Sequence, residues 1–469
     1  MSSAPSAPAR VISAVGSWAG RHRAALVLTA AVTAVYTLFS WRQWARFEVP
    51  SWDLGIFTQL MRAYAELRAP VVPIKGEGFM LLGDHFHPLL AVFAPFYAIW
   101  PSGFTLLVAQ AVCVGISAGI VTACGVRHLG RWPGVAIGAA YGLSWGIQSA
   151  VASQFHEVAL ALPVLAASLS ALVRRRHLAA ALWSLPLLGI KEDLGLTVAV
   201  IGVVIAIRGS RRLGLGLAAL GVAAFWVTTS LVLPALNPDG IWDYAQDSIV
   251  AQLFADPVAA LAGLGAGVTN KLVLVLAVFA ITLFAALASP LALITLPTLA
   301  WRLTSEVPFH WGTEWHYSAV LMVVVFIAAI DALHTRRGAV PLARPAAAVI
   351  AGVAVVVSAW FPLSALTQWA TYSPAIQQQG AQAALEAIED DAVVVSDITL
   401  LAYLAPRAEV YWLNSPGAPV PDYLVVDQAS GGYGANPPRD VVQYATELFG
   451  EHGWVEVVNH QGFMVAARE

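Results

Sequence analysis

The sequence predicts an α-helical membrane protein with about 11 spans, followed by a small α/β domain at the C-terminal end. Three observations support this fold class. The 469 residues are 58% hydrophobic and 11% charged, with a mean hydropathy of +0.71. Apolar runs such as 104–124 reach the roughly 20 residues that a helix needs to span the hydrocarbon. After residue 370 the pattern changes to alternating short helices and strands.

Basic clusters set the expected orientation, because Lys and Arg between spans collect on the cytoplasmic side. They are Arg21/Arg23, Arg127/Arg131, 174–177, 208–212 and 334–337 with Arg344. Placing all of them inside gives expected spans at 24–41, 103–124, 133–152, 158–173, 178–190, 195–208, 213–233, 271–288, 290–303, 317–333 and 345–362. Segment 88–100 contains two prolines and is too short to cross, so we expect a re-entrant or interfacial helix there. Segment 249–268 is expected to be an outer-face helix or hairpin.

This assignment divides the chain into three regions. Residues 1–23 are expected to form a cytoplasmic tail, and no signal-peptide cleavage site follows the first apolar run. Residues 24–369 form the transmembrane domain, with a large first outer loop at 42–102. Residues 370–469 predict an extracytoplasmic α/β domain. We therefore expect a multi-pass plasma-membrane protein, and the net charge of −3 argues against a nucleic-acid partner.

Polar and ionisable residues gather on the expected outer side, although only the basic clusters were used to assign the spans. Five of the 11 histidines fall there, together with acidic residues and a lysine. The group comprises Asp53, Asp84, His85, His87, His156, Glu157, Lys191, Glu192, Asp193, His310 and His316. Because these residues come from separate loops, we hypothesise that they share one site at the outer face.

Two acidic positions lie in the first outer loop. Asp53 opens the apolar-periodic segment 53–67, expected to lie on the membrane surface as a helix, and is either an N-cap or a catalytic or metal-binding carboxylate. In "GDHFHP", Asp84, His85 and His87 offer oxygen and imidazole ligands for a divalent metal. The alternative is a solvated polar loop, since no H-E-x-x-H motif or cysteine pair accompanies them.

Two later outer turns are also candidates. His156 and Glu157 are either substrate-binding residues or an ordinary interfacial turn. Lys191, Glu192 and Asp193 lie between two short apolar runs, where charged residues usually pair or line a polar cavity. Lys191 is therefore either paired with Glu192 or Asp193, or free to hold the phosphate of an anionic lipid-linked substrate.

His316 and Tyr317 open the expected span 317–333. Trp301, Trp311 and Trp315 surround them, and this favours an interfacial aromatic belt over sugar stacking. Both residues are kept as substrate-binding candidates because they join the outer polar group.

Six motifs in order carry a resemblance: "SWDLGIFTQL", "GDHFHPLLAVFAPFYAIWPS", "FHEVALALPVL", "KEDLGLTV", "WHYSAVL" and "PDYLVVD". With them the chain, from about residue 30 to its end, resembles the bacterial and archaeal membrane family catalogued as domain of unknown function 2079 (DUF2079). The layout of that family is similar to that of GT-C glycosyltransferases. Those enzymes have many spans, an acidic residue in a large first outer loop, and often an outer C-terminal domain. They transfer a sugar from a polyprenyl-phosphate carrier to an acceptor outside the cytoplasm.

The resemblance implies a function and partners. Asp53 matches the early acidic residue of the first outer loop, and Asp84 lies where some relatives keep a second one, so both are candidates for the catalytic base. The implied partners are a polyprenyl-phosphate lipid, a cell-envelope glycan or protein acceptor, and the membrane lipids. The first loop lacks the expected D-x-D or E-D dipeptide. The cation that offsets phosphate charge thus has three candidates: Lys191, Arg302, or a divalent metal on Asp84, His85 and His87.

Two other function classes stay open. One is a transporter or flippase of a lipid-linked or small envelope precursor, which would suit broken helices and intramembrane charges. That class is expected to carry ionisable residues between both faces, whereas the polar groups here gather at one face. The other is a non-catalytic envelope-assembly protein that docks through residues 370–469.

Overall fold

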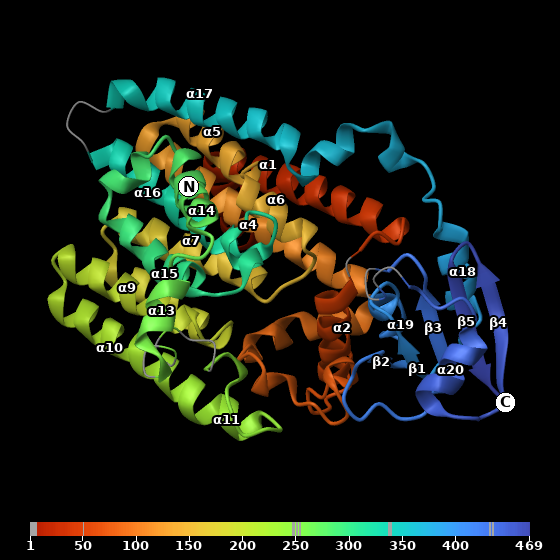
Figure 1. Ribbon diagram of the computed structural model, residues 1–469. Helices are drawn as coiled ribbons and strands as arrows, with labels where there is room; N and C mark the ends of the chain where they lie inside the picture. The colour runs from red at the N-terminus through yellow and green to blue at the C-terminus, as the bar shows by residue number, and fades with distance from the viewer. Residues whose placement is uncertain are drawn as a thin grey trace.

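A helical bundle and a five-stranded sheet form the two parts of the protein, and helix α2 lies between them (Figure 1). The computed structural model describes residues 7–49, 51–245, 255–335, 340–430 and 436–469, together with 249, 252 and 433.

The helices follow one another with short connections. In the first half they are α1 (Ala7–Ala45), α2 (Ser51–Ala65), α3 (Ala94–Ile99), α4 (Gly103–Leu129), α5 (Arg131–Gly142), α6 (Trp145–Ala152), α7 (Val158–Val173), α8 (His177–Ser184), α9 (Leu194–Ile207) and α10 (Arg211–Val227). In the second half they are α11 (Leu233–Leu236), α13 (Pro257–Gly263), α14 (Val268–Ala280), α15 (Leu296–Thr304), α16 (Ala319–Thr335) and α17 (Val340–Val357). Short helical turns connect them: η1 (Pro73–Lys75), η2 (Leu81–Gly83), η3 (Pro88–Phe93), η4 (Leu185–Gly189), η5 (Thr228–Val232), η6 (Asp243–Ala245), η7 (Ala285–Ala288), η8 (Pro290–Thr295), η9 (Pro308–Trp311), η10 (His316–Ser318), η11 (Ser358–Trp360), η12 (Pro362–Thr367) and η13 (Trp369–Tyr372).

Six helical stretches in the described residues are long and apolar enough to cross a membrane. They are His22–Ala45, Gly103–Leu129, Arg131–Ala152, Arg211–Leu236, Pro308–Thr335 and Leu342–Trp360, and each overlaps a predicted span. Four other predicted spans coincide with shorter apolar helices: Val158–Val173, His177–Gly189, Leu194–Ile207 and Val268–Ala280. The one predicted span not yet matched, 290–303, corresponds to η8 and α15. The helical membrane fold is confirmed, and a total of about eleven crossings stays a prediction.

The structure gives more detail on three of the expected segments. Helix α1 begins at Ala7, so most of the expected tail at 1–23 is helical, and residues 1–6 lie outside the described part. Segment 88–100 is built from η3 and α3, with Leu90 and Tyr97 buried and Ile99 exposed, as expected of an interfacial helix. Segment 249–268 lies partly outside the described residues, and α13 falls within it.

Helix α16 forms the centre of the bundle. Every residue from Ala319 to Ala332 is buried, because its sequence is apolar on all sides apart from Asp331. Helix α10 lies at the periphery and exposes Leu215 and Trp226. The bundle is therefore built around one largely apolar helix, with lipid-facing helices outside it.

The C-terminal part is a mixed sheet with strand order β2-β1-β3-β5-β4. Its strands are β1 (Val393–Ser396), β2 (Glu409–Trp412), β3 (Tyr423–Asp427), β4 (Trp454–His460) and β5 (Phe463–Arg468), and its helices are α18 (Gln378–Glu386), α19 (Leu401–Leu404) and α20 (Val441–Phe449). Strand β1 pairs in parallel with β2 and β3, whereas β5 is antiparallel to β3 and β4. The predicted α/β pattern after residue 370 is confirmed.

This domain docks on the first loop of the membrane domain. The Gln59 side chain in α2 donates to the Val410 carbonyl over 2.7 Å, and the Ser51 hydroxyl accepts from the Ala402 amide over 2.8 Å. Tyr403 stacks on Trp44 at 3.9 Å between ring centroids. Helix α2 is therefore clamped between the bundle and the sheet, on the same side of the molecule as the C-terminal domain.

The interface leaves no room for a side chain at position 55. A Cβ atom on Gly55 would lie 2.9 Å from the Leu401 Cβ and 3.0 Å from the Ile74 Cδ1. We expect Gly55→Leu to destabilise this docking by roughly 1–3 kcal/mol through overpacking. Faster proteolysis of the 370–469 domain would show it. The control is Gly352→Leu, because a Cβ there meets nothing within 4 Å; equal proteolysis of both variants would contradict the prediction.

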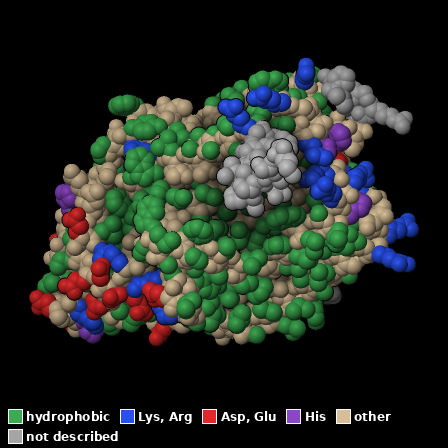
Figure 2. Space-filling model, turned by 180° about the vertical axis from the view of Figure 1, so that it is seen from behind, with side chains coloured by type: hydrophobic (Ala, Val, Ile, Leu, Met, Phe, Trp, Pro, Cys, Tyr) green, Lys and Arg blue, Asp and Glu red, His purple; other side chains and the backbone are tan. Residues whose placement is uncertain are grey.

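Charge is distributed unequally between the two ends of the molecule. Figure 2 shows Asp and Glu mixed with Lys and Arg over the end that carries the C-terminal sheet, while Lys and Arg predominate at the opposite end. This segregation agrees with the expected collection of basic residues on one side of the membrane.

Candidate functional site

The predicted outer residues converge where α2, the 83–88 turn, the 153–157 turn, the 190–193 turn and η10 meet. Direct contacts link them in pairs across these elements. The pairs are Asp53–His156, His156–His316, Glu157–Lys191 and His85–Glu192, and Asp84 pairs with Lys75 of η1, which was not predicted. Five segments that are far apart in the sequence therefore build one polar site, as hypothesised from their sidedness.

Asp53 is the exposed carboxylate of the site. It lies in the first turn of α2, not at an N-cap, and its side chain is 44% exposed. One carboxylate oxygen lies 3.3 Å from Nε2 of His156, which is buried. Burial opposes charging of His156, but the negative charge of Asp53 outweighs burial and raises the pKa of the imidazole. A buried imidazole thus supports a carboxylate that remains accessible.

The ring of His156 is enclosed by aromatic side chains. His316 stacks on it with 3.6 Å between ring centroids, and Tyr317 lies 4.2 Å from His316. Phe57 of α2 meets His156 edge-on at 6.4 Å. The substrate-binding candidates His316 and Tyr317 therefore lie directly behind the Asp53–His156 pair.

Lys191 forms a buried ion pair with Glu157. Its ammonium nitrogen lies 2.6 Å from a Glu157 oxygen, and the two side chains are 16% and 3% exposed. Burial opposes both charges, but each partner offsets it for the other, so the pKa of Lys191 is raised and that of Glu157 is lowered. The expectation of pairing with Glu192 or Asp193 was therefore wrong, because the direct partner comes from the neighbouring outer turn.

Glu192 pairs with His85 instead. Its carboxylate lies 2.7 Å from His85 Nδ1 and accepts the Phe86 amide over 3.1 Å. Despite burial, the positive charge of His85 lowers the pKa of Glu192 to about 2, and Glu192 raises the pKa of His85. The pair therefore ties the 190–193 turn to the 83–88 turn.

This pairing predicts a pH-dependent stability. Because the folded-state pKa of His85 is raised, the pair contributes fully below the unfolded value of about 6.5 and is lost as pH rises through the folded value. We expect Glu192→Gln to lower the thermal midpoint more at pH 6 than at pH 9. Thermal unfolding in detergent at both values measures this, and an equal loss at both would contradict it.

Asp84 has partners that sequence reasoning missed. Lys75 lies 3.1 Å from one carboxylate oxygen, and the Tyr244 hydroxyl donates to the other over 3.3 Å. Tyr244 also stacks on His85 at 4.7 Å between ring centroids. Burial is outweighed by the charges of His85 and Lys75, so the pKa of Asp84 is lowered. Neither Lys75 nor Tyr244 carried a signal in the sequence, since each lies in a loop without a motif.

The expected metal ligands do not converge. Asp84 faces Lys75 and His85 faces Glu192, while Nδ1 of His87 is buried without a partner among the described residues. Within those residues, no group of three or more His, Cys, Asp or Glu side chains is arranged to hold a metal ion. The donor set Asp84, His85 and His87 therefore does not fit a divalent metal, because two of its members are committed to ion pairs.

Two further candidates differ in how they are held. Burial raises the pKa of Asp193 to about 6, and its Oδ1 has no partner among the described residues. Arg302 is buried and donates to the carbonyls of His310 and Gly312 and to the Ser318 hydroxyl, each over 2.7 Å. The guanidinium thus holds the 310–318 loop, so of the two cations predicted from the sequence Lys191 is the one that pairs within the site.

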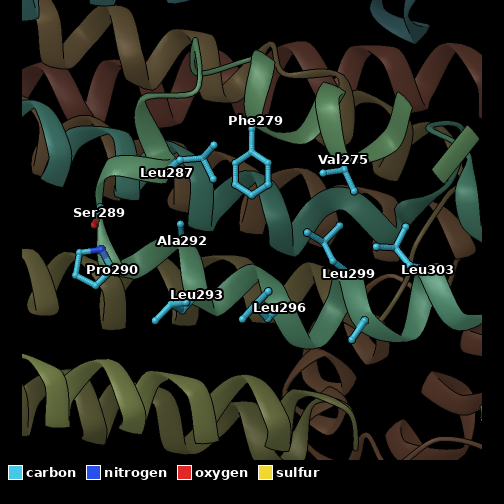
Figure 3. A pocket seen from close by; sticks show the side chains of 11 residues that line it. Val275, Phe279, Leu287, Ser289, Pro290, Ala292, Leu293, Leu296, Leu299 and Leu303 are labelled. Carbon is cyan, nitrogen blue, oxygen red and sulfur yellow. The ribbon is translucent and has the colours of Figure 1, made fainter. Parts of the chain in front are cut away.

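An apolar groove of about 680 Å³ lies beside this loop. Side chains of α14, η7, η8 and α15 line it, and Figure 3 shows Val275 and Phe279 opposite Leu299 and Leu303. Arg302 lies between the last two along α15 and places its guanidinium 5.7 Å from the Tyr317 ring. The groove and the Arg302–Tyr317 contact therefore share helix α15.

Comparison with known proteins agrees with this description. Residues 44–454 match the family described as "Predicted membrane protein (DUF2079)", so the chain belongs to that family. No curated protein matches the sequence. Two solved structures have a similar fold: ArnT from Cupriavidus metallidurans, both bound to undecaprenyl phosphate and in the apo state.

The similarity to ArnT extends over the whole chain. Both superpositions have a TM-score of 0.51 at 14% sequence identity. They cover 94% and 97% of this chain and 97% and 98% of ArnT. The protein is therefore a DUF2079 member whose fold is similar to that of ArnT, and the identity is low enough that the likeness shows the fold alone.

Proposed function

We propose that this protein is a GT-C-type glycosyltransferase that moves a sugar from a polyprenyl-phosphate donor to a cell-envelope acceptor on the outer face of the plasma membrane. The observation that carries the proposal is an exposed carboxylate and a buried lysine in one polar site, in a bundle that also holds an apolar groove. Tyr317 contacts His316, which stacks on His156, the partner of Asp53. The Tyr317 ring also lies 5.7 Å from the guanidinium of Arg302, a residue of the helix α15 that lines the groove.

The chemistry of sugar transfer assigns a role to each part. The acceptor hydroxyl must lose a proton, and Asp53 is the accessible carboxylate that can take it. The departing phosphate develops negative charge, which Lys191 stabilises. An ammonium group has three N–H donors, and within the described part of the chain Lys191 makes one ion pair, with Glu157. The prenyl chain would occupy the apolar groove, as suits a ligand of the kind bound to ArnT.

The second polar half of the site suits the sugar or the acceptor. Tyr244 is exposed, His85 is half-buried, and the buried Asp84 contacts Tyr244. Together they offer oxygen and imidazole partners for hydroxyl groups. Their loops join Lys191 through Glu192. We assign this half to hydroxyl recognition.

Reconstitution in liposomes tests the function. The purified protein is incubated with radiolabelled polyprenyl-phosphate sugars, and both transfer to envelope acceptors and movement of the donor across the bilayer are measured. Transfer with no transbilayer movement is expected. Movement without transfer would replace the proposal by a flippase.

The flippase alternative has one structural observation in its favour. Asp331 of α16 pairs with Arg208 and accepts from the Ser289 hydroxyl over 2.5 Å, and Ser289 also lines the groove. The bundle therefore contains a buried pair of charged side chains in addition to the polar groups gathered at one face. Arg208 is bound further to the Leu172 carbonyl over 3.0 Å, so this charge is locked in place instead of lying free along a path.

Sidedness is part of the same proposal, with the N-terminus cytoplasmic and the C-terminal domain extracytoplasmic. Both native cysteines, Cys113 and Cys124, are buried, so introduced cysteines report cleanly. An impermeant thiol reagent added to intact cells should label Glu451→Cys in the C-terminal domain and leave Arg175→Cys unlabelled. The reverse labelling would overturn the assigned orientation.

A further inference from the structure

His156 is held in one tautomer by the backbone. Its Nδ1 lies 3.0 Å from the Gln154 carbonyl oxygen, and its amide donates to the Gln110 side chain over 3.2 Å. A carbonyl oxygen can only accept a hydrogen bond, so Nδ1 must carry the hydrogen. The other ring nitrogen, Nε2, is therefore the one whose protonation can change.

Nε2 faces the carboxylate of Asp53, which in its ionised form can only accept a hydrogen bond. It lies 3.3 Å from Oδ2 of Asp53. An ionised carboxylate and a neutral imidazole with its hydrogen on Nδ1 would present two lone pairs to each other. The contact requires one proton between the two atoms, so the pair is either imidazolium with carboxylate or imidazole with carboxylic acid.

The surrounding charges favour the imidazolium form. The carboxylates facing His156 are Asp53 and, next to it in the chain, Glu157, while the positive or titratable neighbours are His316 and Lys191. The charge of Lys191 is directed at Glu157, and His316 is stacked on His156. Two stacked imidazoles cannot both be charged at low cost, so His316 stays neutral while His156 carries the proton.

We propose that Asp53 and His156 share a single proton and act as one acid–base unit, in which His156 is a positioning residue for Asp53. Its catalytic use rests on the proposed transferase function. In the transfer step, the acceptor O–H bond breaks and its proton passes to Asp53 while the acceptor oxygen bonds to the sugar C1. The bond from C1 to the phosphate oxygen breaks, and the phosphate leaves with the electron pair.

The shared proton is tested without any substrate, by a double-mutant cycle of thermal unfolding. His156→Asn keeps an amide donor for the Gln154 carbonyl and removes the contact with Asp53. At pH 6 we expect Asp53→Asn and His156→Asn each to lower the thermal midpoint, and the double variant to fall no further than the worse single one. Because a raised histidine pKa stabilises only below the folded-state value, the coupling should shrink by pH 9.

A matched pair of variants provides the control. His310 lies on the same loop as His316 and contacts Ser305 and Tyr317 but makes no contact with Asp53 in the described structure. Asp53→Asn combined with His310→Gln should therefore give additive losses at both pH values. Additive losses for the His156 pair at pH 6, or an equal coupling at pH 9, would overturn the shared proton.

A pH profile of sugar transfer tests the positioning role. We expect transfer by the natural protein to decline at alkaline pH as His156 loses its proton. His156→Gln offers a donor to Asp53 that does not titrate, so this decline should be absent from the variant. An unchanged alkaline limb would overturn the positioning role. If the cycle shows coupling but no transfer is found in liposomes, the shared proton stands and the transferase proposal fails, so the two failures are distinguishable.

Discussion

Replacing Asp53 by Asn is expected to lower sugar transfer by about 10²- to 10⁴-fold, the range that general acid–base catalysis supplies. The amide has nearly the same shape, so the start of α2 should survive, while the charged contact with His156 is lost. The lost property is the ability to take the acceptor proton. Initial rates of transfer from a radiolabelled polyprenyl-phosphate sugar, in membranes that contain equal amounts of protein, measure the effect.

The comparison variant for this experiment is Asp239→Asn. Asp239 is exposed in the loop that leads to Tyr244, and its carboxylate makes no contact among the described residues. The same chemical change there should leave transfer within twofold or so of the natural rate, since an unpaired surface carboxylate contributes little. If Asp53→Asn transfers as fast as Asp239→Asn, Asp53 is not the base.

Replacing Lys191 by Met is expected to destabilise the protein by about 3–5 kcal/mol, because it leaves Glu157 buried without its partner. The loss should shrink as pH falls below the unfolded value of about 4.5, since the depressed pKa of Glu157 contributes stability only above that value. Thermal unfolding of the detergent-solubilised protein over a pH series measures both features.

Two further variants distinguish the effect of breaking a buried ion pair from the effect of losing any charged side chain. Lys191→Met combined with Glu157→Leu removes both charges and should recover much of the loss, since an apolar pair of similar volume avoids desolvation. Arg468→Met breaks an ion pair with Asp422 in which the side chains are 36% and 41% exposed, and should cost no more than about 1 kcal/mol. A Lys191→Met variant as stable as Arg468→Met would contradict the burial argument.

The membrane class and the C-terminal α/β domain were predictable from the sequence, and so was the grouping of several outer loops. Apolar period and run length report directly on burial in lipid, and basic residues report on the side of the membrane. The prediction that several loops lie on the outer side was enough to group residues that the structure brings into contact. These loops are at 53, 84–87, 156–157, 191–193 and 316–317. The resemblance to GT-C enzymes added the expected chemistry.

Pairing within the site was decided by the tertiary structure alone. The choice of Glu157 over Glu192 as the partner of Lys191, and of Lys75 for Asp84, depends on where four separate turns meet. The apolar runs and basic clusters predict on which side of the membrane each turn lies, but they do not predict the distance between two turns. For the same reason a metal site was expected from Asp84, His85 and His87, while the fold directs two of them to other partners.

The sequence by itself thus determined that this protein lies in the membrane and that its ionisable loops share one face, because hydrophobic burial and charge sidedness are properties of single segments. Only the tertiary structure decided which carboxylate stays accessible, which carboxylate pairs with Lys191, and which nitrogen of His156 faces Asp53. Those outcomes depend on contacts between separate segments, for Asp53–His156 and His85–Glu192 more than 100 residues apart, where the packing of the bundle, not local pattern, sets the distance.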